Sequence, residues 1–219
     1  MIAGLGIVLD EFTNTCFNVN ITFENYNSLG GTMVYTALLR GINVGGNNKV
    51  DMKILKKSFE EAGMKNVVTY INSGNIVFTS DRNSKNDIAN ILEEAILDVF
   101  GLQIKVLVLS LEDMKNVMSS LPDSWTNDAN MKSDVFFLWE DIDDESILDK
   151  LTFKPEIETV KYAPGAILWT IDKINVTKSG MTKLIGTKLY KQMTVRNVNT
   201  TRKIYELMLV AEKQLLGCS

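Results

Sequence analysis

The chain is arranged around the polar, glycine-rich stretch Arg40-Gly41-Ile42-Asn43-Val44-Gly45-Gly46-Asn47-Asn48-Lys49. An apolar run over residues 34–39 precedes it, and a helix-like run begins at Asp51. Glycine loses entropy on ordering but lets the backbone turn sharply or approach another group closely. A loop with three Gly and three Asn after a strand that ends in Arg therefore costs more conformational entropy than a simple connection between two elements requires. It is a candidate site.

The composition is that of a globular protein without membrane spans. The 219 residues allow one large or two small domains, and 45% apolar and 23% charged residues are ordinary proportions. No window of about eighteen uninterrupted apolar residues occurs, which excludes a spanning helix. Cys16 and Cys218 lie near opposite ends of the chain. This excludes a disulfide framework and predicts a cytoplasmic protein.

The absence of histidine narrows the chemistry. With no His in the chain, Ser-His-Asp and Cys-His devices and His-ligated metal sites are excluded. The acidic run over residues 140–145 lacks the spacing of a calcium loop and is typical of a helix start. No metal site is predicted, and neither a cofactor nor a catalytic residue is identified. An enzyme of this sequence would use Asp, Glu, Lys or Tyr, or electrostatics alone.

Residues 1–32 differ from the rest because they contain three acids and no Lys or Arg. Ser28-Leu29-Gly30-Gly31-Thr32-Met33 is also what a purine-rich ribosome-binding sequence would encode just before a start codon. We expect residues 1–32 to be a non-native or disordered leader, with Met33 as the true start; a native flexible acidic leader is the alternative. Without its acids, 24 acidic residues face 23 basic ones, so the basic footprint of a nucleic-acid-binding domain is absent.

The first half predicts the order strand, helix, strand, strand, helix, strand. Asp51 is a suitable helix N-cap, and Ser84 with Asp87 resembles a capping box. The polar residues 72–75 supply hairpin chemistry between two β-rich runs. The expected strands cover residues 34–40, 67–71, 76–79 and 104–109, and the expected helices cover residues 51–62 and 84–100.

The second half predicts the same order, preceded by a connecting helix over residues 111–121 and followed by one more helix. The expected strands cover residues 135–139, 158–162, 166–171 and 194–196. The expected helices cover residues 143–151, a run from Ser179 or Thr182 to Leu189, and a final helix capped by Asn199 that ends near residue 215. The predicted fold class is α+β, with two tandem ferredoxin-like (βαββαβ) subdomains and antiparallel sheets. The first covers residues 33–110, a connecting helix and linker 111–132, and the second, with the C-terminal helix, 133–219.

This topology predicts where polar residues gather. The loop after the first strand and the hairpin between the second and third strands should lie at the same end of the sheet. The alternative is a pair of ordinary turns, since Gly, Asn and Ser favour turns for backbone reasons. The candidate ligand-binding residues of this end are Arg40, Gly41, Asn43, Gly45, Gly46, Lys49, Ser73, Gly74 and Asn75.

Two expected helix starts in the second half carry basic residues and hydroxyls, over residues 178–183 and 196–203. Free N–H groups and the positive dipole end of a helix N-terminus form an anion site. The alternative is plain capping with solvated charges. The candidate ligand-binding residues here are Lys183, Arg196, Asn197 and Asn199.

The chain contains three distinctive motifs, which are Leu39 to Gly46, Tyr70-Ile71-Asn72-Ser73-Gly74-Asn75-Ile76-Val77-Phe78, and Thr194 to Thr200. Together they resemble the uncharacterised bacterial family catalogued as domain of unknown function 1697. The resemblance covers Met33 to Leu215 and implies two tandem ferredoxin-like subdomains without implying an activity. Val198 replaces the Trp of the family's RNWNT pattern, and its Ser-Lys-Leu signature is split into Ser179 and Lys183-Leu184.

The sequence leaves three functions open. The favoured one is binding of an anionic, phosphate- or carboxylate-bearing small ligand, with Arg40 forking onto an oxyanion and backbone N–H groups completing the cradle. The second is an interaction module for a protein or single-stranded RNA; the RNA version is not favoured because stacking aromatics are missing. The third is a His-independent enzyme acting on a phosphorylated substrate, with Lys49 or Lys183 as acid or base. Neither a P-loop nor a GxGxxG motif occurs, and the oligomeric state is not predicted.

Overall fold

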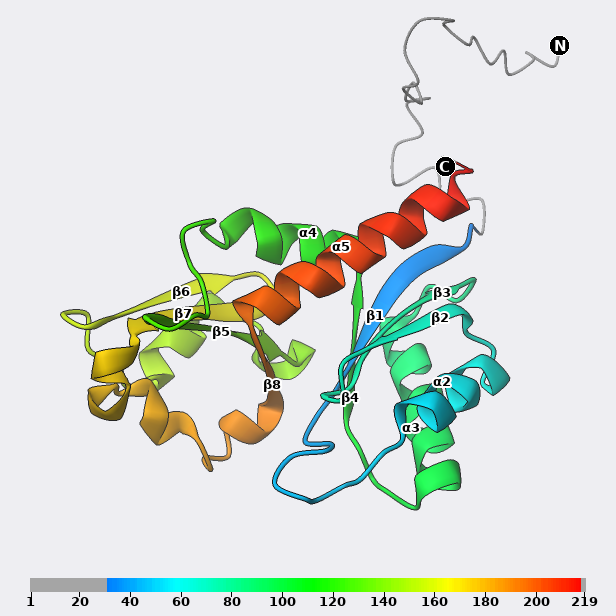
Figure 1. Ribbon diagram of the computed structural model, residues 1–219, viewed down its shortest axis with the longest axis horizontal. Helices are drawn as coiled ribbons and strands as arrows, with labels where there is room; N and C mark the ends of the chain where they lie inside the picture. Colours follow the sequence, from blue (N-terminus) through cyan, green and yellow to red (C-terminus); the bar gives the residue numbers. More distant parts are fainter. Residues whose placement is uncertain (1–30, 218–219) are drawn as a thin grey trace, which may run out of the picture.

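The computed structural model describes residues 31–217. The expected leader, apart from Gly31 and Thr32, lies outside the described residues. The described chain is a mixed α+β fold with two four-stranded antiparallel sheets, which lie beside each other in Figure 1 with helices packed on their faces.

The first sheet has the strand order β2-β3-β1-β4. Its strands are β1 Met33–Leu39, β2 Lys65–Tyr70, β3 Asn75–Ser80 and β4 Val106–Ser110. Helix α2, Met52–Glu61, lies between β1 and β2, and helix α3, Lys85–Phe100, between β3 and β4. The order of strands and helices predicted for this half is present.

Local capping explains both helices. The Asp51 carboxylate accepts from the backbone N–H groups of Lys53 and Ile54, and the Ser84 hydroxyl accepts from that of Asp87. Helix α3 ends at Gly101, whose φ of 66° lies in the left-handed region that only glycine adopts cheaply. The apolar faces of both helices cover one face of the sheet and bury alternate β1 residues such as Tyr35 and Ala37.

The second sheet has the strand order β6-β7-β5-β8. Its strands are β5 Met131–Leu138, β6 Glu158–Ala163, β7 Ala166–Asp172 and β8 Met193–Asn197. In place of α-helices, short 3-10 segments cover one face of this sheet. They are η1 Glu140–Ile142, η2 Glu145–Lys150, η3 Lys173–Lys178, η4 Met181–Leu184 and η5 Tyr190–Gln192.

The helices predicted for residues 143–151 and for 179 or 182 to 189 are therefore wrong. In the first region the Asp144 carboxylate accepts from the N–H of Ser146 and caps η2, so this span is a short 3-10 helix rather than an α-helix. In the second region Gly186 has a φ of 88°, which an α-helix cannot accommodate. The apolar residues that suggested helices are still used, since Ile147 and Met181 pack in the core beneath the sheet.

Two further helices connect the halves. Helix α4, Leu111–Ser120, begins with a capping box between Ser110 and Asp113. Helix α5, Val198–Leu215, is capped by Asn197, whose side chain accepts from the N–H of Thr200. The prediction that Asn199 caps this helix is therefore wrong by two residues, because Asn199 already lies in its first turn.

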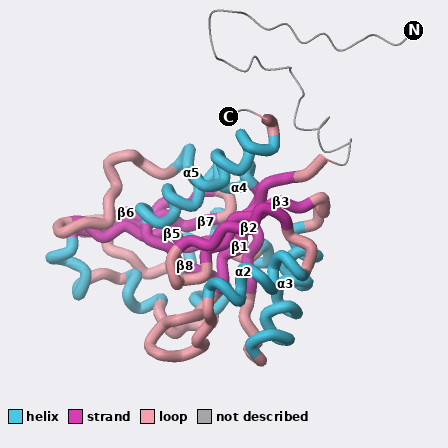
Figure 2. Tube along the Cα trace, turned by 45° about the vertical axis from the view of Figure 1, so that its right-hand side comes forward, coloured by secondary structure: helices cyan, strands magenta, loops and turns pink. Residues whose placement is uncertain are grey.

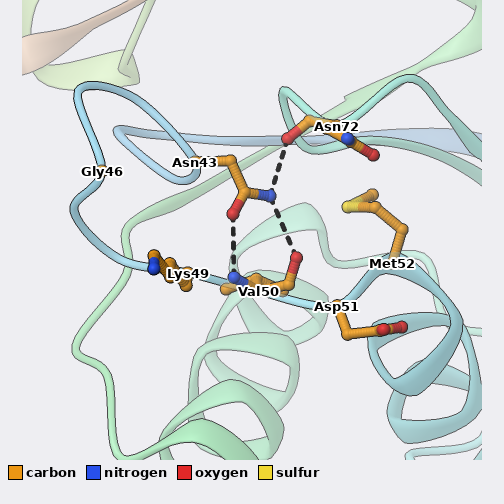
Figure 3. Close-up of a pocket in the computed structure, with 7 residues that line it drawn as sticks. All are labelled: Asn43, Gly46, Lys49, Val50, Asp51, Met52 and Asn72. Carbon is orange, nitrogen blue, oxygen red and sulfur yellow. Dashed lines mark hydrogen bonds between the residues drawn. The ribbon is translucent and has the colours of Figure 1, made fainter.

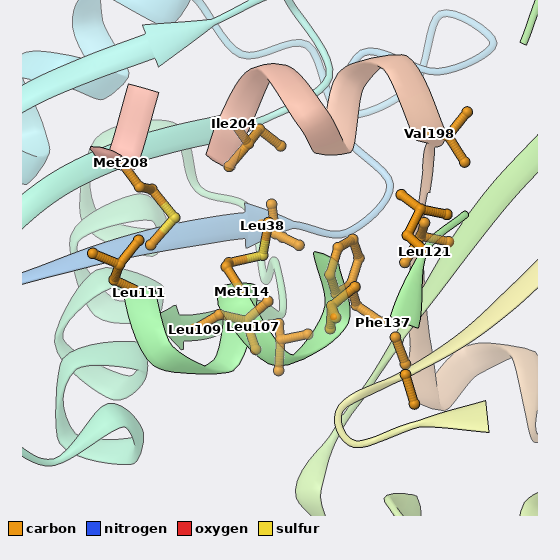
Figure 4. Packing of buried hydrophobic residues seen from close by; sticks show 14 of the residues in the cluster. Leu38, Leu107, Leu109, Leu111, Met114, Leu121, Phe137, Val198, Ile204 and Met208 are labelled. Atoms are coloured by element: carbon orange, nitrogen blue, oxygen red, sulfur yellow. The ribbon is translucent and has the colours of Figure 1, made fainter. Parts of the chain in front are cut away.

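Helices α4 and α5 pack against both sheets and give the two halves one shared core (Figures 1 and 2). Leu38 and Leu107 of the first sheet and Phe137 of the second point into this core (Figure 4). Met114 from α4 and Ile204 from α5 fill the space between them. The C-terminal helix therefore returns to the first sheet and contacts β1 and β3 as well as its own half.

Within residues 31–217, no helix has both the length and the apolar character that crossing a membrane requires.

Candidate functional site

The glycine-rich loop after β1 folds into a small, tight turn. The N–H of Asn47 donates to the carbonyl of Val44 at 3.1 Å, and the N–H of Asn43 donates to the carbonyl of Asn48 at 3.1 Å. Gly45 and Gly46 occupy the tip of this turn with φ values of 59° and 80°. The left-handed backbone there explains the two adjacent glycines.

Asn43 fastens this loop to the hairpin between β2 and β3. Its amide nitrogen donates to the carbonyls of Val50 at 3.0 Å and of Asn72 at 2.9 Å (Figure 3). Its amide oxygen accepts from the N–H of Val50 at 2.9 Å. The two polar loops that the topology placed at one end of the sheet therefore lie side by side, and Asn43 is a structural tie between them.

The hairpin residues are also engaged in structure. Gly74 packs so closely that an added Cβ would lie 2.7 Å from the Cβ of Leu39. Asn75 is fully buried and donates to the carbonyl of Tyr70 and to the hydroxyl of Ser73, each at 3.0 Å. Two hollows lie beside these loops, and Ser73, Gly74 and Asn75 line neither of them.

Arg196 on β8 reaches across to this end of the first sheet. Its Nε donates to the Asn75 amide oxygen, and its Nη2 donates to the carbonyls of Leu39 at 2.9 Å, Ser73 at 3.0 Å and Gly74 at 3.1 Å. Its Nη1 donates within its own strand, to Thr194 and Val195.

Arg196 is 7% exposed as a residue. Burial lowers its pKa to about 10, so the guanidinium stays charged at neutral pH. Because all its nitrogen atoms donate to protein oxygens, Arg196 ties the two sheets together and presents no free edge to a ligand.

Arg40 lies at the other side of the loop and is only partly buried. Its Nε donates to the carbonyl of Met193 at 3.0 Å and its Nη2 to that of Tyr190 at 3.3 Å. The guanidinium carbon lies 5.6 Å from the centre of the Tyr190 ring, within the range of a cation–π contact. Among the described residues, no acceptor is assigned to Nη1. The second half of the chain therefore holds the guanidinium in place and leaves one edge of it unused.

Arg40 lines an open hollow of about 410 Å³ between the loop, the start of β4 and the segment η5. Lys105 and Lys191 line the same hollow, so three basic residues border it. The side-chain amides of Asn47, Asn48 and Gln103 are also part of its lining. Within residues 31–217, Glu93 is the one carboxylate in contact with these cations, through the Lys105 ammonium at 3.4 Å.

The sequence predictions missed Lys105 and Lys191. Lys105 could have been predicted from the topology, because β4 runs antiparallel to β1 and therefore begins at the end of the sheet where β1 finishes. Nothing in the sequence pattern could indicate Lys191, since the packing of η5 against Arg40 joins segments 150 residues apart.

A second hollow, of about 420 Å³, lies on the other side of the loop and is lined by Asn43, Gly46, Lys49, Val50, Asp51, Met52 and Asn72 (Figure 3). Its charges are one cation, Lys49, and one carboxylate, Asp51, which already caps α2. The carboxylate at the helix start disfavours a bound anion. The Arg40 hollow is therefore the better anion site.

The remaining candidates are dispersed. Lys183 is exposed on η4 and lines neither hollow. Asn197 caps α5, and the amide of Asn199 donates to the carbonyl of Asn127 at 2.9 Å. Gly41 lines the Arg40 hollow, while Gly45 lines neither of the two.

A buried carboxylate, Glu158 on β6, was also missed. It accepts from the Trp169 ring N–H and from the backbone N–H groups of Gly180 and Lys154, each at 2.8 Å, and from the Ser179 hydroxyl. Burial raises the pKa of the Glu158 carboxyl, but these hydrogen bonds outweigh it and hold the pKa below its ordinary value. Every oxygen is satisfied from within the protein, so Glu158 anchors the 3-10 segments.

In the described part of the chain, no group of three or more Cys, Asp and Glu side chains is arranged to hold a metal ion.

The fold and this loop define an α+β protein whose two sheets meet at a polar end. Residues 33–168 match the family described as "Protein of unknown function (DUF1697)", and the chain belongs to that family. It is similar to a solved structure, the conserved bacterial protein SP0830 from Streptococcus pneumoniae. The identity is 32% with a TM-score of 0.70, over 81% of this chain and 99% of the other. No curated protein matches the chain.

Proposed function

We propose that this protein binds a small anionic ligand, bearing a phosphate or a carboxylate, in the hollow around Arg40. The observation that carries the proposal is the arrangement of Arg40, whose guanidinium is fixed by two carbonyls and an aromatic ring at the edge of a polar hollow. A guanidinium matches the geometry of carboxylate and phosphate oxygens. Because its side chain is already ordered, binding costs less conformational entropy.

The lining of the hollow supports the same ligand class. Lys105 and Lys191 add positive charge, and the side-chain amide of Gln103 can donate a hydrogen bond to an oxygen atom of a ligand. A volume of about 410 Å³ lies within the range of small-molecule sites.

We also propose that each half is a variant of the ferredoxin-like unit. The strand orders β2-β3-β1-β4 and β6-β7-β5-β8 place corresponding strands in corresponding positions. In the second half, the 3-10 segments occupy the place of the two helices that cover the first sheet.

Thermal unfolding in the presence of ligands tests the binding proposal. A compound present at about a hundred times its Kd should stabilise the protein by about 2.7 kcal/mol, which shifts the melting temperature upward. We expect such a shift from members of a panel of phosphorylated and carboxylated small molecules, and its loss in Arg40→Ala.

Arg202→Ala is the matched control, because Arg202 also donates to backbone carbonyls, those of Trp125 and Pro122, but lies outside the hollow. It should lower the melting temperature of the free protein while keeping the shift caused by ligand. If no compound of the panel shifts the wild-type protein, the proposal fails and a module for protein or RNA interaction becomes the favoured function.

A further inference from the structure

We infer that the Arg40 hollow selects a dianion, and therefore a phosphate monoester, over carboxylates and other monoanions. The inference rests on the proposed function and deepens it by naming the ligand class. The observation behind it is the charge of the hollow, which Arg40, Lys105 and Lys191 all line.

The opposing charges around this hollow are few. Arg40 is held by the uncharged carbonyls of Met193 and Tyr190, so its charge is not neutralised by a carboxylate. Glu93 offsets Lys105 through the contact at 3.4 Å. Three cations and one carboxylate leave a net charge of about two, which a dianion neutralises and a monoanion does not.

The position of the two lysines favours recognition by charge. Lys105 directly precedes β4 and Lys191 lies in η5, so the two lysines belong to different halves of the chain. A compact, flexible ammonium acts on phosphate as a point charge, while a guanidinium fixes its orientation. Arg40 would therefore orient the phosphate and the two lysines would set the preferred charge.

The histidine-free sequence makes this preference measurable by pH. Between about pH 5.5 and 7.5, the ordinary pKa values of Asp and Glu lie below the range and those of Lys, Arg and Tyr above it. A phosphate monoester takes up its second negative charge with a pKa of about 6. A change in affinity over this window thus reports the charge of the ligand.

Phenyl phosphate and phenyl sulfate form a suitable pair of probes, since they differ little in shape and the sulfate stays a monoanion. We expect the affinity for phenyl phosphate, measured by titration calorimetry on the whole chain, to rise about fourfold from pH 5.5 to 7.5 as the dianion fraction grows. The affinity for phenyl sulfate should stay constant and remain below that for phenyl phosphate at pH 7.5.

Variants of the charged residues at the hollow test whether their charge causes the preference for a dianion. Lys191→Gln should weaken phenyl phosphate binding and flatten its pH dependence, while Lys188→Gln, an exposed neighbour that lines neither hollow, should change nothing. Glu93→Gln should tighten binding, because it removes the opposing charge and keeps an oxygen for the N–H of Val106.

The outcomes separate the inference from the proposed function. Equal, pH-independent affinity for both probes would overturn dianion selection while leaving anion binding intact. Absence of binding by both probes would overturn dianion selection, and together with the absence of a thermal shift from the whole panel it would overturn anion binding as well. Binding that survives Lys191→Gln with its pH dependence unchanged would show that the charge of this hollow does not select the ligand.

Discussion

Gly74 shows how strongly a single residue constrains the end of the first sheet. Its φ of 73° is left-handed, and an added Cβ would lie 2.7 Å from Leu39 and 2.8 Å from Ile42. Gly74→Ala should therefore destabilise the protein by about 2–4 kcal/mol, from backbone strain and overpacking together. Urea unfolding measures this change.

Gly45→Ala provides the comparison at the tip of the neighbouring loop. Gly45 also has positive φ, but a Cβ added there would meet no other atom of residues 31–217 within 4 Å. Only the backbone cost of about 1–2 kcal/mol should apply. Equal losses in the two variants would show that crowding at Gly74 contributes nothing.

Asparagine side chains account for much of what made the loops conspicuous in the sequence. Asn43 and Asn75 satisfy backbone carbonyls, and Asn48 donates to the carbonyl of Gly41 at 2.9 Å. These bonds explain why the two loops are rich in Asn without requiring a ligand. The ligand proposal therefore depends on Arg40 and the lysines rather than on the asparagines.

At the scale of secondary-structure elements, Glu158 fixes the turns that replace helices in the second half. Glu158→Gln retains an acceptor for Lys154 and Gly180 but deprives the Trp169 ring N–H of its carboxylate oxygen. We expect a loss of about 1–3 kcal/mol at neutral pH. The exposed Glu156→Gln is the control and should change stability by less than about 0.5 kcal/mol.

The same carboxylate makes stability depend on pH. Its pKa in the folded state lies below the ordinary value of 4.5, so its contribution is present above pH 4.5 and is lost as the pH falls through the folded pKa. Urea unfolding of the wild type at a series of acidic pH values should show this loss, and Glu158→Gln should lack that part of it. A variant with an unchanged acid profile would contradict the assignment.

For the whole molecule, the shared core predicts that both halves unfold together. Leu38 of β1 is fully buried in the cluster that also contains Phe137 of β5. Trp125 and Trp139 pack in this shared core and Trp169 packs in the core of the second sheet, so tryptophan fluorescence reports on these two cores. Leu38→Ala should cost about 2–5 kcal/mol and shift the tryptophan transition to lower urea.

If both halves unfold together, the transitions measured by fluorescence and by far-UV circular dichroism should coincide. A tryptophan transition that stays in place while circular dichroism shifts would show that the halves unfold independently. Arg196 gives a second reason to expect coupling, because it bonds the last strand of one sheet to three carbonyls of the other half.

Sequence alone determined the features that are encoded locally. Caps at Asp51 and Ser84, the stop at Gly101 and the alternating apolar runs were enough to predict every strand and the first-half helices. Three short motifs were enough to predict the family. These signals depend on residues that are close together in the chain, so they can be recognised from the sequence alone. The two helices that were predicted wrongly lie in the second half. There the apolar spacing suggested α-helices, but the chain forms short 3-10 turns instead.

Only the tertiary structure decided how the halves meet. The sequence offered both Arg40 and Arg196 as candidate ligand-binding residues, yet Arg196 is buried among carbonyls and Arg40 borders an open hollow. The difference arises because α5 and β8 return to the first sheet and place Tyr190, Lys191 and Met193 beside Arg40. Contacts between residues about 150 positions apart depend on the packing of the shared core, and no local pattern encodes them.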